Sequence, residues 1–302
     1  MARTTQTATQ TATQTATPPR VQVLLAYAVL YTVWGSTYLA MKIAVKTLPP
    51  FSTAALRFVF SGLLLVALGR LFDKTAITRR HLLAALGQGV LLLVFGNAAV
   101  MWAMKTVPSG AGALILAITP LFIALLSRDF RPATWLGLGL GTVGIGILVD
   151  PFSSTGVIAT SGVLLLVFAS ASWALGSMLP RHLPPHPSNA TATGLQMLVG
   201  AVLQFALARS LGEQVVVATT TTASWLALLY LAVFGSLLGF SCYGWLLKVE
   251  PASRVSTYAY VNPVVAVMLG ALLGGEQITS RVVAAAAVII VGVVLILRTR
   301  RP

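Results

Sequence analysis

Aromatic and amide side chains recur inside long apolar stretches of this sequence. Trp34 and Tyr38 lie four residues apart near one end of the chain, and Tyr258 and Asn262 repeat that spacing near the other. Residues four apart share one face of a helix. Polar groups inside an apolar stretch need a partner or a watery cavity. We therefore predict a cavity that binds a small molecule, lined by Trp34, Tyr38, Asn97, Trp173, Ser177, Tyr243, Tyr258 and Asn262.

Three of these residue types also have structural interpretations. Trp and Tyr favour the interface between membrane and water, so Trp34 and Tyr38 could serve as packing and anchoring residues. Asn97 could join two helices through its amide, as interhelical asparagines commonly do. Both alternatives stay open at the level of the sequence.

Arg57 is the charged residue that lies well inside an apolar stretch, six residues after Phe51. Its long stem could carry the guanidinium back to the aqueous surface, or the charge could have a structural partner. The remaining interpretation is a contact with an anionic group of the bound molecule.

The acidic residues and histidines lie elsewhere. All of them fall in predicted loops or at the ends of apolar stretches, so no deep carboxylate can relay protons. No metal cluster, phosphate loop or nucleophile–base pair is recognisable. The sequence predicts neither an enzyme nor ATP coupling within this chain, and no metal or cofactor. The residues concerned are Asp73, Asp129, Asp150, Glu213, Glu250, Glu276, His81, His182 and His186.

Composition identifies the elements that must position these side chains. The 302 residues are 57% hydrophobic and only 9% charged, whereas soluble domains carry about 25% charged residues. A bilayer core takes roughly 20 apolar residues per helix. The sequence therefore predicts an all-α integral membrane protein with ten spans, near 22–45, 51–70, 82–104, 108–127, 132–149, 160–180, 189–208, 224–247, 251–273 and 281–298.

The net charge of +14 has a topological explanation. With alternating loops and a cytoplasmic N-terminus, fourteen Lys and Arg residues fall on the cytoplasmic side and five on the outer side. This is the positive-inside asymmetry, and it places both termini in the cytoplasm. The bilayer therefore accounts for the basic charge, and a nucleic-acid partner is not expected. Residues 1–20, a Thr/Gln/Ala repeat up to Pro19, are predicted to be a disordered cytoplasmic tail.

The chain also contains an internal repeat. Trp102, Lys105, Pro108 and Pro120 recur 143 residues later as Trp245, Lys248, Pro251 and Pro263, whereas Trp34 and Trp173 match at an offset of 139. Five spans per half is an odd number, so the second half enters the membrane from the opposite side. We predict a first repeat over 21–150 and an inverted second repeat over 158–299. Such repeats are typical of alternating-access transporters.

Pro120 and Pro263 occupy matching positions, twelve residues after the proline that opens each span. This lies about 18 Å into a core of about 30 Å. Proline removes one helical hydrogen bond and clashes with the preceding turn. We predict a pair of matching kinks, which serve either a rocking motion or packing.

Longer motifs carry a resemblance to a known family: "WGSTYLAMKIAVKTLPPF" (34–51), "TVPSGAGALILAITPLF" (106–122) and "STYAYVNPVVAVMLGALLGGE" (256–276). With them the sequence resembles the EamA family of the drug/metabolite transporter superfamily, and the YedA-like exporters in particular. The resemblance implies ten helices in two inverted EamA repeats, in the inner membrane of a bacterium. It also implies export of amino acids, related metabolites or toxic compounds from a cavity lined by spans 1, 3, 4, 6, 8 and 9.

Small multidrug relatives in that superfamily use a glutamate in their first helix, where this sequence has Trp34, Ser36 and Tyr38. Proton antiport by that route is therefore not expected. A gradient-driven facilitator is one alternative, and a non-transporting receptor or scaffold is another. The small-residue pair Gly137 and Gly141 marks close helix packing within a monomer or across a homodimer.

Overall fold

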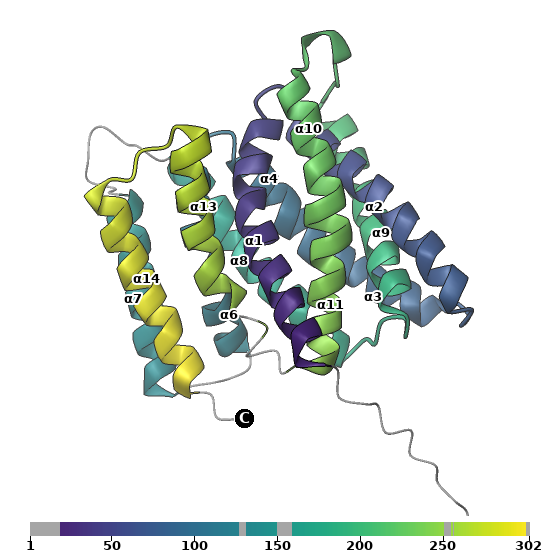
Figure 1. Cartoon of the computed structure of the whole chain (residues 1–302), viewed down its shortest axis with the longest axis horizontal. Helices are drawn as coiled ribbons and strands as arrows, with labels where there is room; N and C mark the ends of the chain where they lie inside the picture. Colours follow the sequence, from purple (N-terminus) through teal and green to yellow (C-terminus); the bar gives the residue numbers. More distant parts are fainter. Residues whose placement is uncertain (1–18, 127–130, 150–158, 251–254, 256, 300–302) are drawn as a thin grey trace, which may run out of the picture.

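The computed structural model describes residues 19–126, 131–149, 159–250, 255 and 257–299. Every regular element in these ranges is helical (Figure 1). The elements of the first half are α1 (Arg20–Ala44), α2 (Pro50–Phe72), α3 (Arg79–Gln88), the π-helical η1 (Gly89–Ala98), α4 (Ala99–Ala103), α5 (Ser109–Leu116), α6 (Thr119–Leu126) and α7 (Pro132–Val149). Those of the second half are α8 (Thr160–Met178), η2 (Leu179–Arg181), α9 (Asn189–Ser210), η3 (Val217–Thr219), α10 (Thr222–Tyr230), the π-helical η4 (Leu231–Leu238), α11 (Gly239–Val249), α13 (Tyr258–Gly274) and α14 (Ser280–Thr299).

Seven helical stretches of the described chain are long and apolar enough to cross a membrane. Three of the ten predicted spans correspond instead to shorter apolar helices, at Trp135–Leu148, Val261–Gly274 and Ser280–Gly292. The predicted number of ten spans therefore stays a prediction. The seven longer stretches are Arg20–Ala44, Pro50–Phe72, Arg79–Ala103, Ser109–Leu126, Thr160–Arg181, Asn189–Ser210 and Thr222–Val249.

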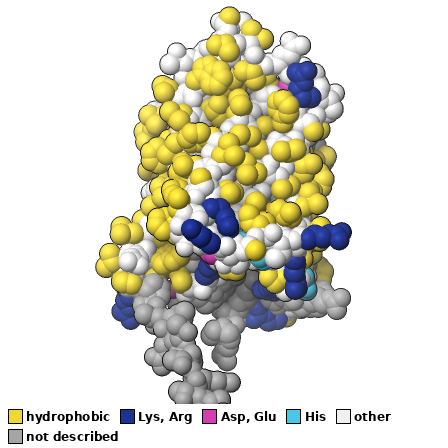
Figure 2. Space-filling model, turned by 90° about the vertical axis from the view of Figure 1, so that its right-hand side faces the viewer, with side chains coloured by type: hydrophobic (Ala, Val, Ile, Leu, Met, Phe, Trp, Pro, Cys, Tyr) yellow, Lys and Arg dark blue, Asp and Glu magenta, His cyan; other side chains and the backbone are white. Residues whose placement is uncertain are grey.

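The surface is patterned as a bilayer requires. Figure 2 shows hydrophobic side chains over the middle of the molecule and most of the visible Lys and Arg side chains toward its lower end. Large apolar residues such as Leu63, Val202 and Phe205 are exposed at 57%, 67% and 59%. Lipid, rather than protein, is the environment that such side chains require.

Helices of the two sequence halves pack against each other in pairs. α2 lies along α9, α7 lies along α14, and α1 contacts α13 (Figure 1). Glycines allow the close approach: a Cβ on Gly62 would lie 3.0 Å from the carbonyl oxygen of Gly194, and one on Gly292 would lie 2.9 Å from that of Gly137. Backbone atoms of Gly137 and Gly141 thus lie against Gly292 of α14 in the same chain, whereas a Cβ on Gly141 would meet Leu121 of α6. The two halves interlock and do not form separate bodies.

The two prolines occupy different positions in their helices, and the prediction that both kink their spans stays a prediction. The helix breaks at Ala117 and Ile118, between α5 and α6, and Pro120 is the second residue of the new helix. Proline fits there because its missing N–H has no helical partner in the first turn. Pro263 lies inside α13, which continues through it.

Candidate substrate cavity

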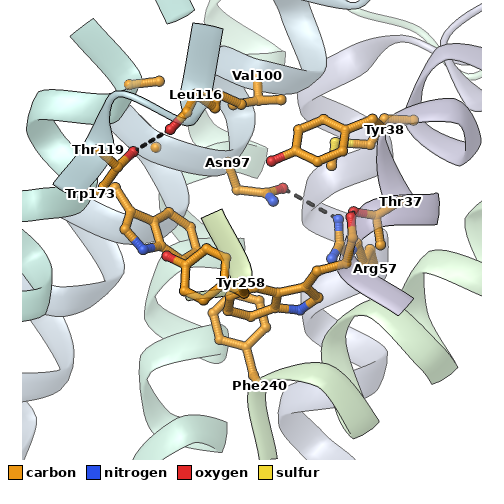
Figure 3. A pocket seen from close by; sticks show the side chains of 14 residues that line it. Thr37, Tyr38, Arg57, Asn97, Val100, Leu116, Thr119, Trp173, Phe240 and Tyr258 are labelled. Carbon is orange, nitrogen blue, oxygen red and sulfur yellow. Dashed lines mark hydrogen bonds between the residues drawn. The ribbon is translucent and has the colours of Figure 1, made fainter. Parts of the chain in front are cut away.

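A cavity of about 80 Å³ lies where α1, α2, α8, α11 and α13 converge on η1 and on the break between α5 and α6 (Figure 3). This volume accommodates several water molecules. Both sequence halves contribute to its wall. The lining residues are Trp34, Thr37, Tyr38, Met41, Arg57, Gly96, Asn97, Val100, Leu116, Thr119, Ala169, Trp173, Phe240 and Tyr258.

Trp34 is the centre of the aromatic part of this wall. Its ring centroid lies 5.8 Å from that of Trp173, in an edge-to-face geometry of 89°. Phe240 and Tyr258 lie at 5.3 and 5.2 Å from it. Edge-to-face pairs of this kind stabilise one another beyond simple burial. Because Trp34 and Trp173 are repeat equivalents, the two halves meet ring against ring at the cavity.

The orientation of Trp34 is fixed by its own hydrogen bond. The indole Nε1 donates to the carbonyl oxygen of Gly235 at 3.2 Å. Gly239 leaves the space for the ring, since a Cβ there would collide with Nε1. The indole nitrogen of Trp173 is also buried, and the side chains of Tyr243 and Tyr258 lie next to it. The indole of Trp34 is thus fixed by a backbone carbonyl, whereas that of Trp173 faces two tyrosines.

Arg57 supplies a positive charge at the cavity wall. Its side chain is only 2% exposed, so the predicted alternative in which it extends to the aqueous surface is wrong. The face of α2 that carries Arg57 is turned toward η4, where Nε donates to Ser236 Oγ at 2.5 Å. Nη1 donates to Asn97 Oδ1 at 3.4 Å, and the guanidinium lies 4.9 Å from the ring centroid of Phe58. Among the described residues no carboxylate pairs with it.

The two polar partners of Arg57 are related by the internal repeat. Asn97 ends the motif "VFGN" (94–97) and Ser236 ends "VFGS" (233–236), which lies 139 residues later. They belong to η1 and η4, the two π-helical segments, which are the repeat-related parts of the third span of each half. Single-turn π distortions are frequent at functional sites, because they redirect side chains. Ser236 was not among the predicted site residues, although this short repeat would have identified it.

Five of the eight predicted binding residues line the cavity: Trp34, Tyr38, Asn97, Trp173 and Tyr258. In Figure 3 the hydroxyl of Tyr38 points into the space opposite Trp173. The predicted placement of these five residues at one cavity agrees with the structure. Whether they contact a substrate stays a prediction.

The other three predicted residues lie outside the lining. Ser177 Oγ donates to the carbonyl oxygen of Trp173, one turn back in its own helix, at 2.8 Å. Tyr243 packs behind Trp34, with ring centroids 5.1 Å apart. Asn262 is 2% exposed, and its amide nitrogen lies 3.1 and 3.2 Å from the carbonyl oxygens of Tyr31 and Tyr258. With the amide oriented to donate, Asn262 joins α1 to α13 instead of facing the cavity.

Thr37, Thr119 and Phe240 line the cavity although the sequence prediction did not include them. The two threonine hydroxyls donate to carbonyl oxygens three residues back, at 2.7 and 2.8 Å. They therefore add little free polarity to the wall. Phe240 lies three residues before Tyr243 on one helix, a spacing that could have indicated it.

No metal site accompanies the cavity. Across the described ranges, no three His, Cys, Asp or Glu side chains come together in a way that could hold a metal ion. The chemistry that the cavity wall offers is aromatic surface and one buried cation.

Membrane-length helices that surround a central cavity built from both halves define a class of polytopic membrane proteins that handle small molecules within the bilayer. Residues 21–149 and 160–298 each match the EamA-like transporter family, and the chain belongs to this family.

Relatives of this chain carry transporter names. The "Uncharacterized inner membrane transporter YedA" of Escherichia coli (strain K12) is 36% identical over 272 residues, covering 88% of each chain. The "Probable amino-acid metabolite efflux pump" of Salmonella typhimurium (strain LT2) is 29% identical over 276 residues, covering 86% of this chain and 89% of the relative. A crystal structure that covers 94% of this chain matches the fold with a TM-score of 0.66 at 22% identity, over 100% of that chain.

Proposed function

We propose that the protein is an inner-membrane transporter that exports small metabolites by alternating access, with both termini in the cytoplasm. The preferred substrates carry an anionic group and an apolar or aromatic body. The observation that carries the proposal is Arg57, a buried cation in the wall of an aromatic cavity with no carboxylate partner among the described residues. An isolated buried charge is costly, and a substrate anion would relieve that cost.

The chemistry of the wall suggests how such a substrate would sit. A carboxylate would lie against Arg57 and Asn97, and an apolar side chain would lie among Trp34, Trp173 and Tyr258. Binding sites of this type combine mostly apolar walls with a few converging polar groups.

The size of the cavity supports a conformational cycle. Sites for drug-sized ligands occupy about 300–1,000 Å³, whereas this cavity measures about 80 Å³. We infer that the cavity of the described conformation is too narrow for such a ligand and that it widens to admit substrate. The interlocked pairing of the two halves provides the surfaces that would shift, and the break at Ala117 and Ile118 lies in the cavity wall.

The support for export comes from the printed name of the Salmonella relative, an amino-acid metabolite efflux pump. The direct test is flux from proteoliposomes that contain the purified protein. We expect phenylalanine, which has a carboxylate and a ring, to leave preloaded vesicles faster than it leaves protein-free vesicles. Phenylalaninamide, which lacks the carboxylate, should leave much more slowly. The proposal fails if a panel of amino acids and related acids shows no acceleration.

A gradient-driven facilitator is the second candidate. It is favoured by the cavity wall itself, in which the described residues include one cation and no acid. A facilitator should equalise substrate across the membrane at any imposed pH gradient. Accumulation against the substrate gradient, driven by protons, would exclude it.

A further inference from the structure

Two glutamates of the second half cap helices of the first half at the same end of the molecule. Glu276 accepts hydrogen bonds from the backbone N–H groups of Ser109, at 2.7 Å to Oε1, and of Gly110, at 3.2 Å to Oε2. These groups open α5, where backbone donors have no helical partner. An anionic acceptor is also favoured there by the helix dipole.

Glu213 makes the same arrangement at the start of α2. Its Oε1 accepts from the N–H of Phe51 at 3.1 Å, and its Oε2 accepts from the N–H of Ser52 at 2.7 Å. The hydroxyl of Ser52 adds a third hydrogen bond at 2.8 Å. Charge-assisted bonds to two adjacent donors are among the stronger polar contacts in proteins.

The same kind of backbone turn positions each carboxylate. Gly212 and Gly275 are the described glycines with positive φ, at 71° and 68°. Each lies just beyond a helix, α9 or α13, and turns the chain so that the next residue folds back. The N–H of Glu213 then donates to the carbonyl oxygen of Ala208 at 2.9 Å, and the N–H of Glu276 donates to that of Gly270, also at 2.9 Å.

In the described part of the other end of the molecule, two polar side chains accept hydrogen bonds from their own helix or loop. There α9, the repeat equivalent of α2, starts with its own Ser188, whose hydroxyl accepts from the N–H of Thr191 at 3.3 Å. Asp73, at the end of α2, accepts from the N–H of Thr75 in its own loop at 2.8 Å. The start of the span that contains α13 lies outside the described residues. In the described part, the carboxylate caps that link the two halves thus lie at the end opposite to the N-terminus of α1.

We propose that Glu213 and Glu276 form a latch that holds the outer end of the transporter closed. Both side chains are half-buried at the surface of this end of the molecule. Replacing either carboxylate with an amide removes the negative charge and one of the two oxygens that accept the N–H bonds. Weakening two contacts between the halves shifts the population toward the state that is open outward.

The charged groups around the latch are cations. Lys42 of α1 interacts electrostatically with Glu276, and Arg281, at the start of α14, lines the same surface hollow as Glu276. Glu213 shares a hollow with Lys46 and Lys105, and Arg209 lies in the last turn of the preceding helix. These cations attract the two carboxylates of the latch. Replacing either carboxylate with a neutral group should therefore weaken the contacts at this end of the molecule.

The proposal rests on the proposed alternating access, and the test measures opening without any substrate. Cys242 is the single native cysteine, so a Cys242→Ala background can carry Val100→Cys, a cavity position that is 6% exposed. A membrane-impermeant maleimide is then added outside intact cells. Thr219→Cys, on an exposed part of the outer loop, gives the labelling rate of a position that is open to the outside in every variant.

We expect labelling at position 100 to rise on the order of tenfold when Glu213→Gln and Glu276→Gln are combined, because several charge-assisted hydrogen bonds are weakened. Asp73→Asn is the matched control, since Asp73 lies at the other end of the molecule, where it accepts from the N–H of Thr75 and interacts electrostatically with His186 and Lys248. It should label at the parent rate.

Folding is checked by gel filtration and thermal unfolding. If a Gln variant does not fold, Glu276→Asp keeps the charge while its shorter side chain cannot span both donors, and it should also raise labelling. The latch is wrong if folded Gln variants label at the parent rate while the parent still transports. If labelling at position 100 rises in the variants but the parent protein transports no substrate, the latch is supported and the proposed transport function is wrong.

Discussion

At the scale of single residues, the deciding feature is a buried charge that has no acidic partner within the described part of the chain. Arg57 is held by Ser236 and Asn97, two neutral side chains from repeat-related segments, and by the ring of Phe58. Neutral partners orient a guanidinium but compensate only part of the cost of burying its charge. Removing the charge should therefore raise the stability of the substrate-free protein and impair transport.

We predict that Arg57→Gln raises the thermal unfolding midpoint of the substrate-free protein by about 2–4 °C, the shift that roughly 1 kcal/mol produces. The same change should raise the KM for phenylalanine efflux roughly ten- to hundredfold, because a charge-assisted contact is lost. Arg70→Gln is the matched control on the same helix, outside the cavity, and should leave the KM unchanged. A destabilised Arg57→Gln protein with normal transport would contradict the assignment.

Trp34 provides a second test at this scale. Adding a methyl group at position 239 with Gly239→Ala would push on the indole nitrogen that donates to Gly235. We expect a tryptophan fluorescence change and at least a tenfold loss of flux, because misplacement by about 1 Å at a binding site is costly. Gly139→Ala, where a Cβ meets nothing within 4 Å, is the control. Equal behaviour of the two variants would argue against a fixed Trp34.

At the scale of elements, two repeat-equivalent prolines have diverged in role. Pro120 lies in the first turn of α6, just after a break, whereas Pro263 lies within α13. The break places Leu116 and Thr119 in the cavity wall. Near Pro263, the neighbouring Asn262 reaches the carbonyl oxygen of Tyr258 and that of Tyr31. The two repeats thus share matching prolines in sequence but differ in helix geometry around them.

This asymmetry predicts different stability effects for the same substitution. Pro263→Ala should stabilise the protein by up to about 3 kcal/mol, since proline is unfavourable in a helix interior. Pro120→Ala should change stability by less than about 1 kcal/mol, because proline suits the first turn. Chemical or thermal unfolding in detergent measures both. The structural assignment would be contradicted by equal effects or by the reverse order.

At the scale of the whole molecule, the paired packing of helices from both halves makes the two repeats one body with two distinct ends. One end contains the two glutamate caps, and the other contains the start of α1 and the loop between α2 and α3. From the positive-inside asymmetry we predict that the latter faces the cytoplasm. The predicted orientation can be tested independently of transport.

In the Cys242→Ala background, Thr219→Cys should react with an impermeant maleimide in intact cells. Ala76→Cys, in the loop after α2, should react only after the membrane is permeabilised. Both positions are exposed, so a difference in labelling reports the side of the membrane. The reverse pattern would overturn the topology and, with it, the outer location of the latch.

Much of the architecture could be read from the sequence because it depends on local properties. Three such properties are visible in the sequence: apolar stretches of membrane length, their separation by charged loops, and the repeat at offsets of 139 and 143 residues. The helical period of 3.6 residues is equally local, and it correctly grouped Trp34 with Tyr38 and brought Tyr258 to the same cavity.

The sequence by itself indicated that the protein lies in a membrane and contains two repeats, and it identified most of the aromatic residues in the cavity wall. Tertiary structure alone decided that Arg57 faces inward, that Asn262 joins two helices, and that two glutamates cap helices of the other half. The reason is that these contacts join distant positions, 179 residues apart for Arg57 and Ser236 and 167 apart for Ser109 and Glu276. Helical periodicity places a side chain on a face, but only the packing of helices decides which group meets it there.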